Sequence, residues 1–96
     1  MTLYVLFCED KPDSEALRLS NRENHLEWVG GKTDQIRLAG PMLSDDGEHM
    51  LGSMFILEAE SVDAVRAFSG QDLYTLAGLW GKVVVHAFRQ VIPSAA

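Results

Sequence analysis

The chain has 96 residues, which is enough for about one domain. Its composition, 47% hydrophobic and 23% charged residues, is that of a folded globular protein rather than a disordered one. The net charge of −6 repels phosphate backbones, and the eight Lys and Arg residues form no run, so nucleic-acid binding is excluded.

The beginning of the chain bears on the compartment. An apolar stretch covers Thr2–Cys8 without a basic leader, and Glu9 and Asp10 follow at once. No apolar run approaches the roughly 20 residues that a membrane span needs. We therefore expect no signal peptide, no membrane association and a cytoplasmic protein. Cys8, the single cysteine, cannot form an intrachain disulfide and is expected to be a reduced core residue.

Alternation, turn residues and helix caps divide the chain into strands and helices. The Gly30-Gly31 pair predicts the end of the first helix, and Gly40-Pro41 the end of the second strand. In chain order the pattern predicts a strand over Leu3–Cys8, a helix from Ser14 (or Asp13) to Gly30, strands over Gln35–Ala39 and Gly52–Ala59 joined by the polar loop Ser44–Glu48, a helix over Val62–Phe68 capped by Ser61, a short helical or irregular piece over Leu73–Leu79, a strand over Val83–Arg89 and a tail over Pro93–Ala96.

The order of these elements, βαββαβ, predicts one α+β domain over residues 1–96. When both crossovers are right-handed, the two helices lie on the same face of a four-stranded antiparallel sheet, which is the ferredoxin-like arrangement. The first and last strands, however, are apolar on both faces, as in Leu3–Cys8. Two helices can cover only one face. A second copy of the sheet is the simplest cover for the other, so we expect a homodimer.

The first helix contains the least ordinary pattern. Leu19, Leu26 and Val29 are spaced as a buried stripe, and Arg22 falls inside that stripe. His25 lies three residues further on the same side, and Arg18 lies one turn before Arg22. We expect Arg22 and His25 to line a partly buried polar pocket that could orient an anionic group. The alternative is that Arg22 forms an ion pair at the sheet edge and His25 is a surface group.

Several other polar residues allow two interpretations. Asp72 follows the second helix, where a carboxylate could hold the tautomer of a histidine or simply cap a turn; Asp34 has the same ambiguity. Ser53, next to Gly52, could present a hydroxyl to a pocket or be a strand-end residue. His49 is expected to be solvated, His86 to be an interface or core residue, and Trp28 and Trp80 to be packing residues. The spacing of the three histidines and the cysteine predicts no metal site and no cofactor.

A set of short motifs, taken in their order and spacing, resembles the YciI-like (YCII-related) proteins over about nine-tenths of the chain. The motifs are Tyr4-Val5-Leu6, Arg22-x-x-His25-Leu26, Leu38-Ala39-Gly40-Pro41, Gly52-Ser53, Asp72-x-Tyr74, Ala77-Gly78-Leu79 and Phe88-Arg89-Gln90-Val91. The resemblance implies a ferredoxin-like fold in a dimeric α+β barrel. It also implies an active site built on a histidine and an aspartate, here His25 and Asp72, with Arg22, Ser53 and Tyr74 as neighbours.

The same resemblance suggests a function, because at least one kind of family member is a dehydrochlorinase of a chlorinated hydroxyquinol. The sequence therefore predicts a small-molecule enzyme of lyase type, with His25 as general acid or base, Asp72 as its orienting partner and Arg22 as anchor for an anionic or phenolic ligand. A non-catalytic module that binds a small acid, or only dimerises, is the alternative. One departure from the family is Leu73, which stands where a proline is usual and leaves the loop of Asp72 less restrained.

Overall fold

The computed structural model describes residues 1–94, so the last two residues of the expected tail Pro93–Ala96 lie outside the described part. The order of elements is the expected βαββαβ with one added helical turn. The elements are β1 (Thr2–Asp10), α1 (Glu15–Gly30), β2 (Ile36–Leu43), β3 (Met50–Ala59), α2 (Val62–Gly70), α3 (Leu73–Leu76) and β4 (Trp80–Phe88).

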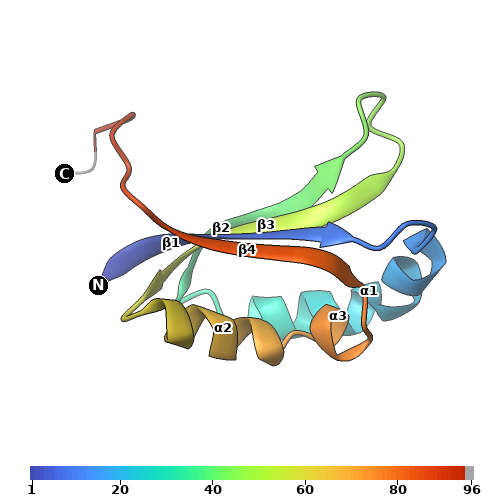
Figure 1. Cartoon of the computed structure of the whole chain (residues 1–96), viewed down its shortest axis with the longest axis horizontal. Coiled ribbons are helices and arrows are strands. Elements are labelled where there is room, and N and C mark those ends of the chain that lie inside the picture. The colour runs from blue at the N-terminus through green and yellow to red at the C-terminus, as the bar shows by residue number, and fades with distance from the viewer. Residues whose placement is uncertain (95–96) are drawn as a thin grey trace.

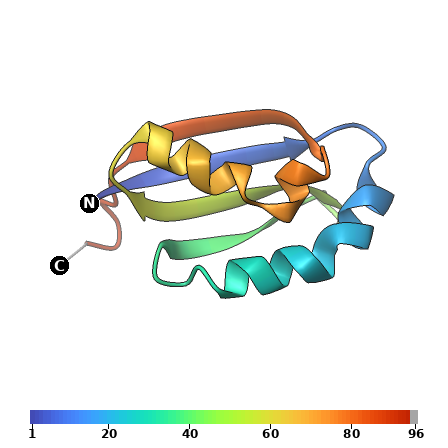
Figure 2. The same cartoon turned by 90° about the horizontal axis from the view of Figure 1, so that it is seen from below.

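The four strands form one antiparallel sheet in the order β2-β3-β1-β4, and the helices cover one of its faces (Figure 1). Figure 2 looks at the sheet from the side that carries the helices. In this view α1 runs along the half of the sheet made by β2 and β3, whereas α2 and α3 lie in front of the half made by β1 and β4. Leu6 of β1 lies opposite Phe55 of β3 and Val85 of β4, so the side chains of adjacent strands share the face beneath the helices. The ferredoxin-like arrangement expected from the sequence is confirmed.

The hydrophobic core lies between this face and the helices. Every second residue of β1 and β3 is buried there, as the period of a strand requires. Trp28 of α1 packs against Phe68 of α2 with ring centroids 4.9 Å apart, which joins the two helices. The buried members of the core are Tyr4, Leu6, Cys8, Phe55, Leu57, Ala59, Val65 and Phe68.

The second strand does not end at Gly40-Pro41 as the sequence suggested; β2 continues through this pair to Leu43. Proline cannot donate to a strand ladder, and it is tolerated where its nitrogen faces away from a partner strand. Because β2 lies at the edge of the sheet, the missing N–H of Pro41 leaves no neighbouring strand without a donor.

The inner face of α1 also differs from the expectation. Leu19 and Leu26, assigned to the buried stripe, are 56% and 47% exposed, and Arg22 is exposed as well. The two buried residues of the helix are Arg18 and His25, seven positions apart and therefore on one face two turns away from each other. The expected stripe was wrong for Leu19 and Leu26 and holds only for Val29, which is half-buried and packs against the core. The helix also packs on the sheet through paired polar groups, which a search for apolar spacing does not find.

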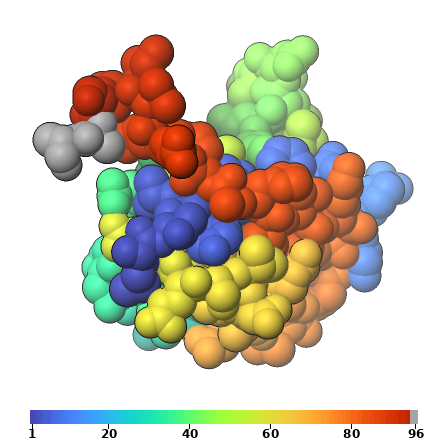
Figure 3. Space-filling view, turned by 60° about the vertical axis from the view of Figure 1, so that its left-hand side comes forward, coloured from blue at the N-terminus to red at the C-terminus, as the bar shows by residue number. Residues whose placement is uncertain are grey.

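The other face of the sheet has no helix on it, and we call it the open face. The β2–β3 hairpin and the C-terminal segment both rise from the sheet on this side, at opposite ends of the molecule (Figure 1), and the space-filling view shows a saddle between them (Figure 3). None of the helices within residues 1–94 is long and apolar enough to cross a membrane. Most side chains on the open face are apolar. Ile56 is buried, and the others are half-buried or exposed: Leu3, Val5, Phe7, Leu38, Met54, Val84, His86 and Phe88.

Candidate functional site

A histidine and an aspartate that are 47 positions apart in the chain meet beneath the sheet. The Nδ1 atom of His25 lies 2.6 Å from Oδ1 of Asp72, and both side chains are buried. The expected contact between these two residues is present. Asp72 is also the N-cap of α3, because the same Oδ1 atom accepts the backbone N–H of Tyr74 at 3.0 Å. Capping and pairing with a histidine, the two alternatives for Asp72, therefore occur together.

This contact determines how the imidazole ring presents itself. A carboxylate can only accept hydrogen bonds, so the Nδ1 atom of His25 must donate to Asp72. In the neutral ring the other nitrogen, Nε2, is then unprotonated. Nε2 has no hydrogen-bond partner among residues 1–94, and His25 lines a pocket. The arrangement leaves a basic nitrogen available to whatever the pocket holds.

Tyr74, the second residue of α3, packs flat against this histidine. Their ring centroids are 3.9 Å apart with an interplanar angle of 17°, so the imidazole cannot easily tilt. The guanidinium carbon of Arg18 lies 4.6 Å from the same tyrosine ring, a cation–π distance. Burial raises the pKa of the Tyr74 phenol, although the positive charges of Arg18 and Arg22 oppose that shift. The phenol therefore stays protonated at neutral pH.

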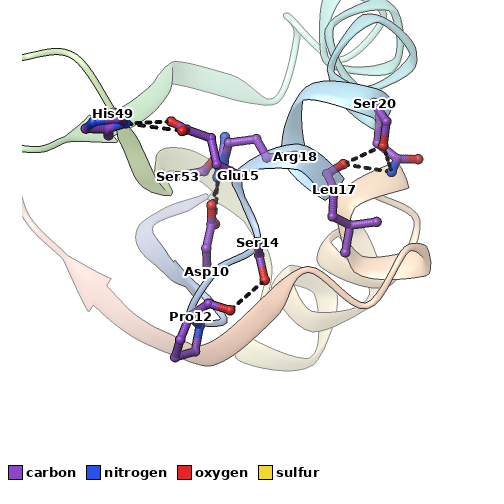
Figure 4. A network of polar contacts seen from close by, with 10 residues as sticks. Asp10, Pro12, Ser14, Glu15, Leu17, Arg18, Ser20, His49 and Ser53 are labelled. Carbon is purple, nitrogen blue, oxygen red and sulfur yellow. Dashed lines mark hydrogen bonds and ion pairs between the residues drawn. The ribbon is translucent and has the colours of Figure 1, made fainter.

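A second buried ion pair lies next to the first. Arg18 reaches from α1 to Asp10 at the end of β1, with Nε to Oδ2 at 2.7 Å and Nη2 to Oδ1 at 2.8 Å, and Nη2 also donates to Oγ of Ser53 in β3 at 3.0 Å (Figure 4). Burial alone would lower the pKa of the Arg18 guanidinium, but the hydrogen bonds and charge of Asp10 raise it above its ordinary value. Arg18 is thus a permanent buried cation whose charge Asp10 balances.

These side chains surround a pocket of about 70 Å³ between α1 and the β2–β3 half of the sheet. His25 and Arg18 are on its helical wall, and Ser53, Phe55 and Tyr74 face them. Arg22 lies at the exposed rim and forms no ion pair within residues 1–94. The pocket therefore has one cation without a balancing carboxylate. The full lining is Arg18, Arg22, His25, Leu26, Val29, Ala39, Gly40, Pro41, Met50, Ser53, Phe55 and Tyr74.

The residues expected from the sequence are largely brought together. Arg22, Ser53 and Tyr74 all line the pocket beside His25. The prediction did not include Arg18 or Asp10 among the site residues; the one available signal was the seven-residue spacing of Arg18 and His25, which places two polar groups on one helix face.

The remaining polar candidates lie away from the pocket. His49, at the end of the β2–β3 loop, has its Nδ1 atom 3.1 Å from both carboxylate oxygens of Glu15 and is exposed, as expected of a solvated residue. His86 is on the open face of β4, and Asp34 is exposed between α1 and β2. Burial, helped by the charge of Asp72, raises the pKa of the Cys8 thiol to about 12, which keeps it unreactive. Within residues 1–94 no group of three His, Cys, Asp or Glu side chains could hold a metal ion.

The departure at Leu73 can be tested on the structure. Leu73 is the first residue of α3, its N–H has no partner within residues 1–94, and Asp72 before it has φ −64° and ψ 133°. All three features suit proline at position 73. Leu73→Pro is therefore expected to raise the free energy of unfolding by about 0.5 kcal/mol, measured by urea denaturation.

Leu76→Pro is the matched control for this change. The N–H of Leu76 donates to the Asp72 carbonyl at 3.0 Å, and its side chain is exposed, so proline there removes a hydrogen bond without removing packing. The control variant should be clearly less stable than the parent. A loss of more than about 1 kcal/mol from Leu73→Pro would show that α3 depends on the leucine.

Comparison with known proteins finds relatives that cover nearly the whole chain. Protein YciI of Escherichia coli O6:H1 is 38% identical, over 93% of this chain and 98% of the relative. An uncharacterized protein of Haemophilus influenzae is 34% identical, over 92% of this chain and 97% of the relative. A similar solved structure is that of 5-chloro-2-hydroxyhydroquinone dehydrochlorinase (TftG) from Burkholderia phenoliruptrix AC1100, in complex with 2,5-dihydroxybenzoquinone. Its sequence is 33% identical, its TM-score is 0.83, and the match covers 91% of this chain and 93% of TftG.

A more distant match shares the fold alone: Rv0793 from Mycobacterium tuberculosis has a TM-score of 0.53 at 14% identity, over 98% of both chains. The family model described as the YCII-related domain matches residues 2–89. The chain therefore belongs to the family of proteins with a YCII-related domain.

Proposed function

We propose that this protein is a small-molecule enzyme of lyase type, in which His25 moves a proton to or from a weakly acidic aromatic ligand. The observation that carries the proposal is the buried 2.6 Å contact between His25 and Asp72. It leaves Nε2 without a partner within residues 1–94, in a histidine that lines a pocket beside Arg22, a cation with no ion-pair partner in the same residues. Support also comes from the similar structure of TftG, a dehydrochlorinase in complex with 2,5-dihydroxybenzoquinone.

Each residue has a chemical task in this proposal. Nε2 of His25 takes the proton, and the carboxylate of Asp72 stabilises the imidazolium that results. Arg22 binds the negative oxygen that the ligand acquires, because no carboxylate of residues 1–94 neutralises its guanidinium. Tyr74 keeps the imidazole plane fixed by stacking.

The elimination of HCl illustrates how these tasks combine. A hydroxyl proton is first transferred to the ring carbon that bears chlorine, which gives a keto tautomer with a tetrahedral C–Cl carbon. A second hydroxyl then loses its proton, the electron pair left on that oxygen forms a carbonyl, the adjacent ring double bond shifts, and chloride leaves with the electrons of the carbon–chlorine bond. The charge of the pocket suits this change. The formal charges of Asp72 and Arg22 sum to zero while His25 is neutral, although these two side chains form no ion pair within residues 1–94. Protonation of His25 then adds one positive charge beside a newly anionic ligand.

Activity measurements on two isosteric variants test the catalytic assignment. His25→Gln removes the base, and Asp72→Asn keeps an oxygen that can cap α3 while removing the negative charge. With 5-chloro-2-hydroxyhydroquinone as substrate and chloride release as the measurement, we expect His25→Gln to lose roughly 10²–10⁴-fold in kcat and Asp72→Asn a comparable amount. His49→Gln, which changes an exposed histidine outside the pocket, is the control and should retain activity.

Retention of activity by His25→Gln would contradict the assignment. If the parent protein binds 2,5-dihydroxybenzoquinone but releases no chloride, the lyase proposal fails, and the protein is a binding module for small acids. That alternative needs the same pocket and the same Arg22, but it does not need Nε2 of His25 to exchange a proton.

We also infer that two copies of the chain associate through their open faces. The open face is apolar, has no cover within residues 1–94 and is flanked by two projecting segments (Figure 1). An apolar sheet face in water is unfavourable, by about 25 cal/mol for each Å² that a partner could cover. Sedimentation equilibrium at micromolar concentration should therefore give twice the chain mass.

A charged substitution distinguishes this face from other exposed apolar residues. Leu38 on the open face is 53% exposed and Leu76 on α3 is 70% exposed, so neither is essential to the core of the single chain. Leu38→Glu should dissociate the dimer, whereas Leu76→Glu should not. A folded monomer for the parent protein would rule out the dimer.

A further inference from the structure

The hydroxyl of Ser53 has an unused proton. Ser53 is 3% exposed, lines the pocket and accepts a hydrogen bond from Nη2 of Arg18 at 3.0 Å. A serine hydroxyl has one proton to donate besides the lone pairs with which it accepts. No side chain or backbone carbonyl within residues 1–94 receives that proton. The pocket is therefore the place where an acceptor for it must be supplied.

Arg18 cannot change its role in this contact. Its Nη2 group has two N–H bonds; one donates to Oδ1 of Asp10 and the other to Oγ of Ser53, while Nε donates to Oδ2 of Asp10. Both side chains of the ion pair are buried, so solvent does not compete for these donors. Arg18 consequently occupies one of the two lone pairs of the Ser53 oxygen and leaves the hydroxyl proton free to donate.

The backbone holds all three residues in place. A register shift between Glu9 and Asp10 marks a bulge at the end of β1, the kind of irregularity that redirects a side chain. Ser53 lies opposite Cys8 of β1, and the preceding residue, Gly52, admits no side chain, because an added Cβ atom would lie 2.2 Å from the carbonyl oxygen of Cys8. β3 therefore lies so close to β1 at this point that only glycine fits before Ser53.

We propose that Arg18 is a positioning residue that holds the Ser53 oxygen in place and leaves its proton for the ligand, and that the group Ser53 recognises is an acceptor oxygen of the ligand, a carbonyl or an ionised phenol. The inference rests on the proposed use of this pocket and deepens it by naming the ligand group. It requires binding only, not proton transfer by His25.

The tasks of the two arginines are therefore different. Arg22 is exposed at the rim and carries the charge that attracts an anion, whereas Arg18 is neutralised by Asp10 and acts through Ser53. A ligand oxygen that accepts the Ser53 proton satisfies a donor that residues 1–94 leave without a partner, whereas an apolar ligand group at the same place would leave this buried donor unpaired.

A thermodynamic cycle tests the proposal with 2,5-dihydroxybenzoquinone as the probe and calorimetry as the measurement. The variants are Ser53→Ala, the double variant Asp10→Asn with Arg18→Met, and the combination of all three; the double variant removes both buried charges together, so neither is left unpaired. We expect Ser53→Ala to weaken binding about tenfold and the double variant to weaken it by a similar factor. Because Arg18 acts through Ser53, the triple variant should bind the probe as tightly as either of them.

Arg22→Leu is the additive control, because Arg22 acts on charge and not through Ser53. Combined with Ser53→Ala, it should multiply the two losses. Should the double variant fail to fold, Arg18→Lys replaces it, since one ammonium cannot reproduce the fixed fork of the guanidinium. It is expected to show the same lack of additivity with Ser53→Ala.

Independent losses from the Arg18 and Ser53 changes would overturn the proposal, as would unchanged binding by the folded Arg18 variant or by Ser53→Ala. Absence of binding by the parent protein would overturn it as well. Repeating the cycle in His25→Gln separates the two proposals. If the losses stay non-additive but the parent protein releases no chloride, the lyase function alone is rejected. If the parent protein releases chloride but the losses are additive, the role of Arg18 alone is rejected.

Discussion

The pairing of buried polar groups beneath α1 is the constraint on which the rest of this structure depends. The helix presents Arg18 and His25 to the sheet where most helices present apolar side chains, and each meets a carboxylate from another element. Removing Arg18 or Asp10 alone leaves an uncompensated buried charge and typically costs about 3–5 kcal/mol. Asp10 and Asp72 must therefore be in place for α1 to pack, and the packing in turn fixes the walls of the pocket.

The fold explains how these partners come together. In the ferredoxin-like order β1 is central, so its end brings Asp10 beneath the start of α1. The chain then returns after α2 through the single turn of α3, whose cap, Asp72, arrives beside the middle of α1. Each carboxylate has a structural task, at a bulge or at a helix cap, in addition to its ion pair. A site built in this way is rigid before any ligand enters, which is what catalysis by positioned groups requires.

Much of this could be predicted from the sequence, and the exceptions have physical causes. Alternating apolar residues and the Gly and Pro punctuation predict the order of strands and helices, and the motif around His25 and Asp72 predicts their meeting. The inner face of α1 could not be predicted from Leu19 and Leu26, because apolar spacing identifies a buried face only when that face is apolar. The continuation of β2 through Gly40-Pro41 could not be predicted either, since proline is acceptable in a strand only at an edge, which requires the topology.

The tautomer of His25 is the property that tests the central claim most directly. Free imidazole rings have no carboxylate to select one nitrogen, whereas Asp72 requires the proton on Nδ1 and leaves Nε2 basic. Nitrogen-15 NMR of histidine-labelled protein, at a pH where the ring is neutral and with His25→Gln to assign the signals, distinguishes the two forms. The account predicts a protonated Nδ1 and an unprotonated Nε2 for His25. A proton on Nε2 in the neutral ring would contradict it, because the base would then point at Asp72 and not at the ligand.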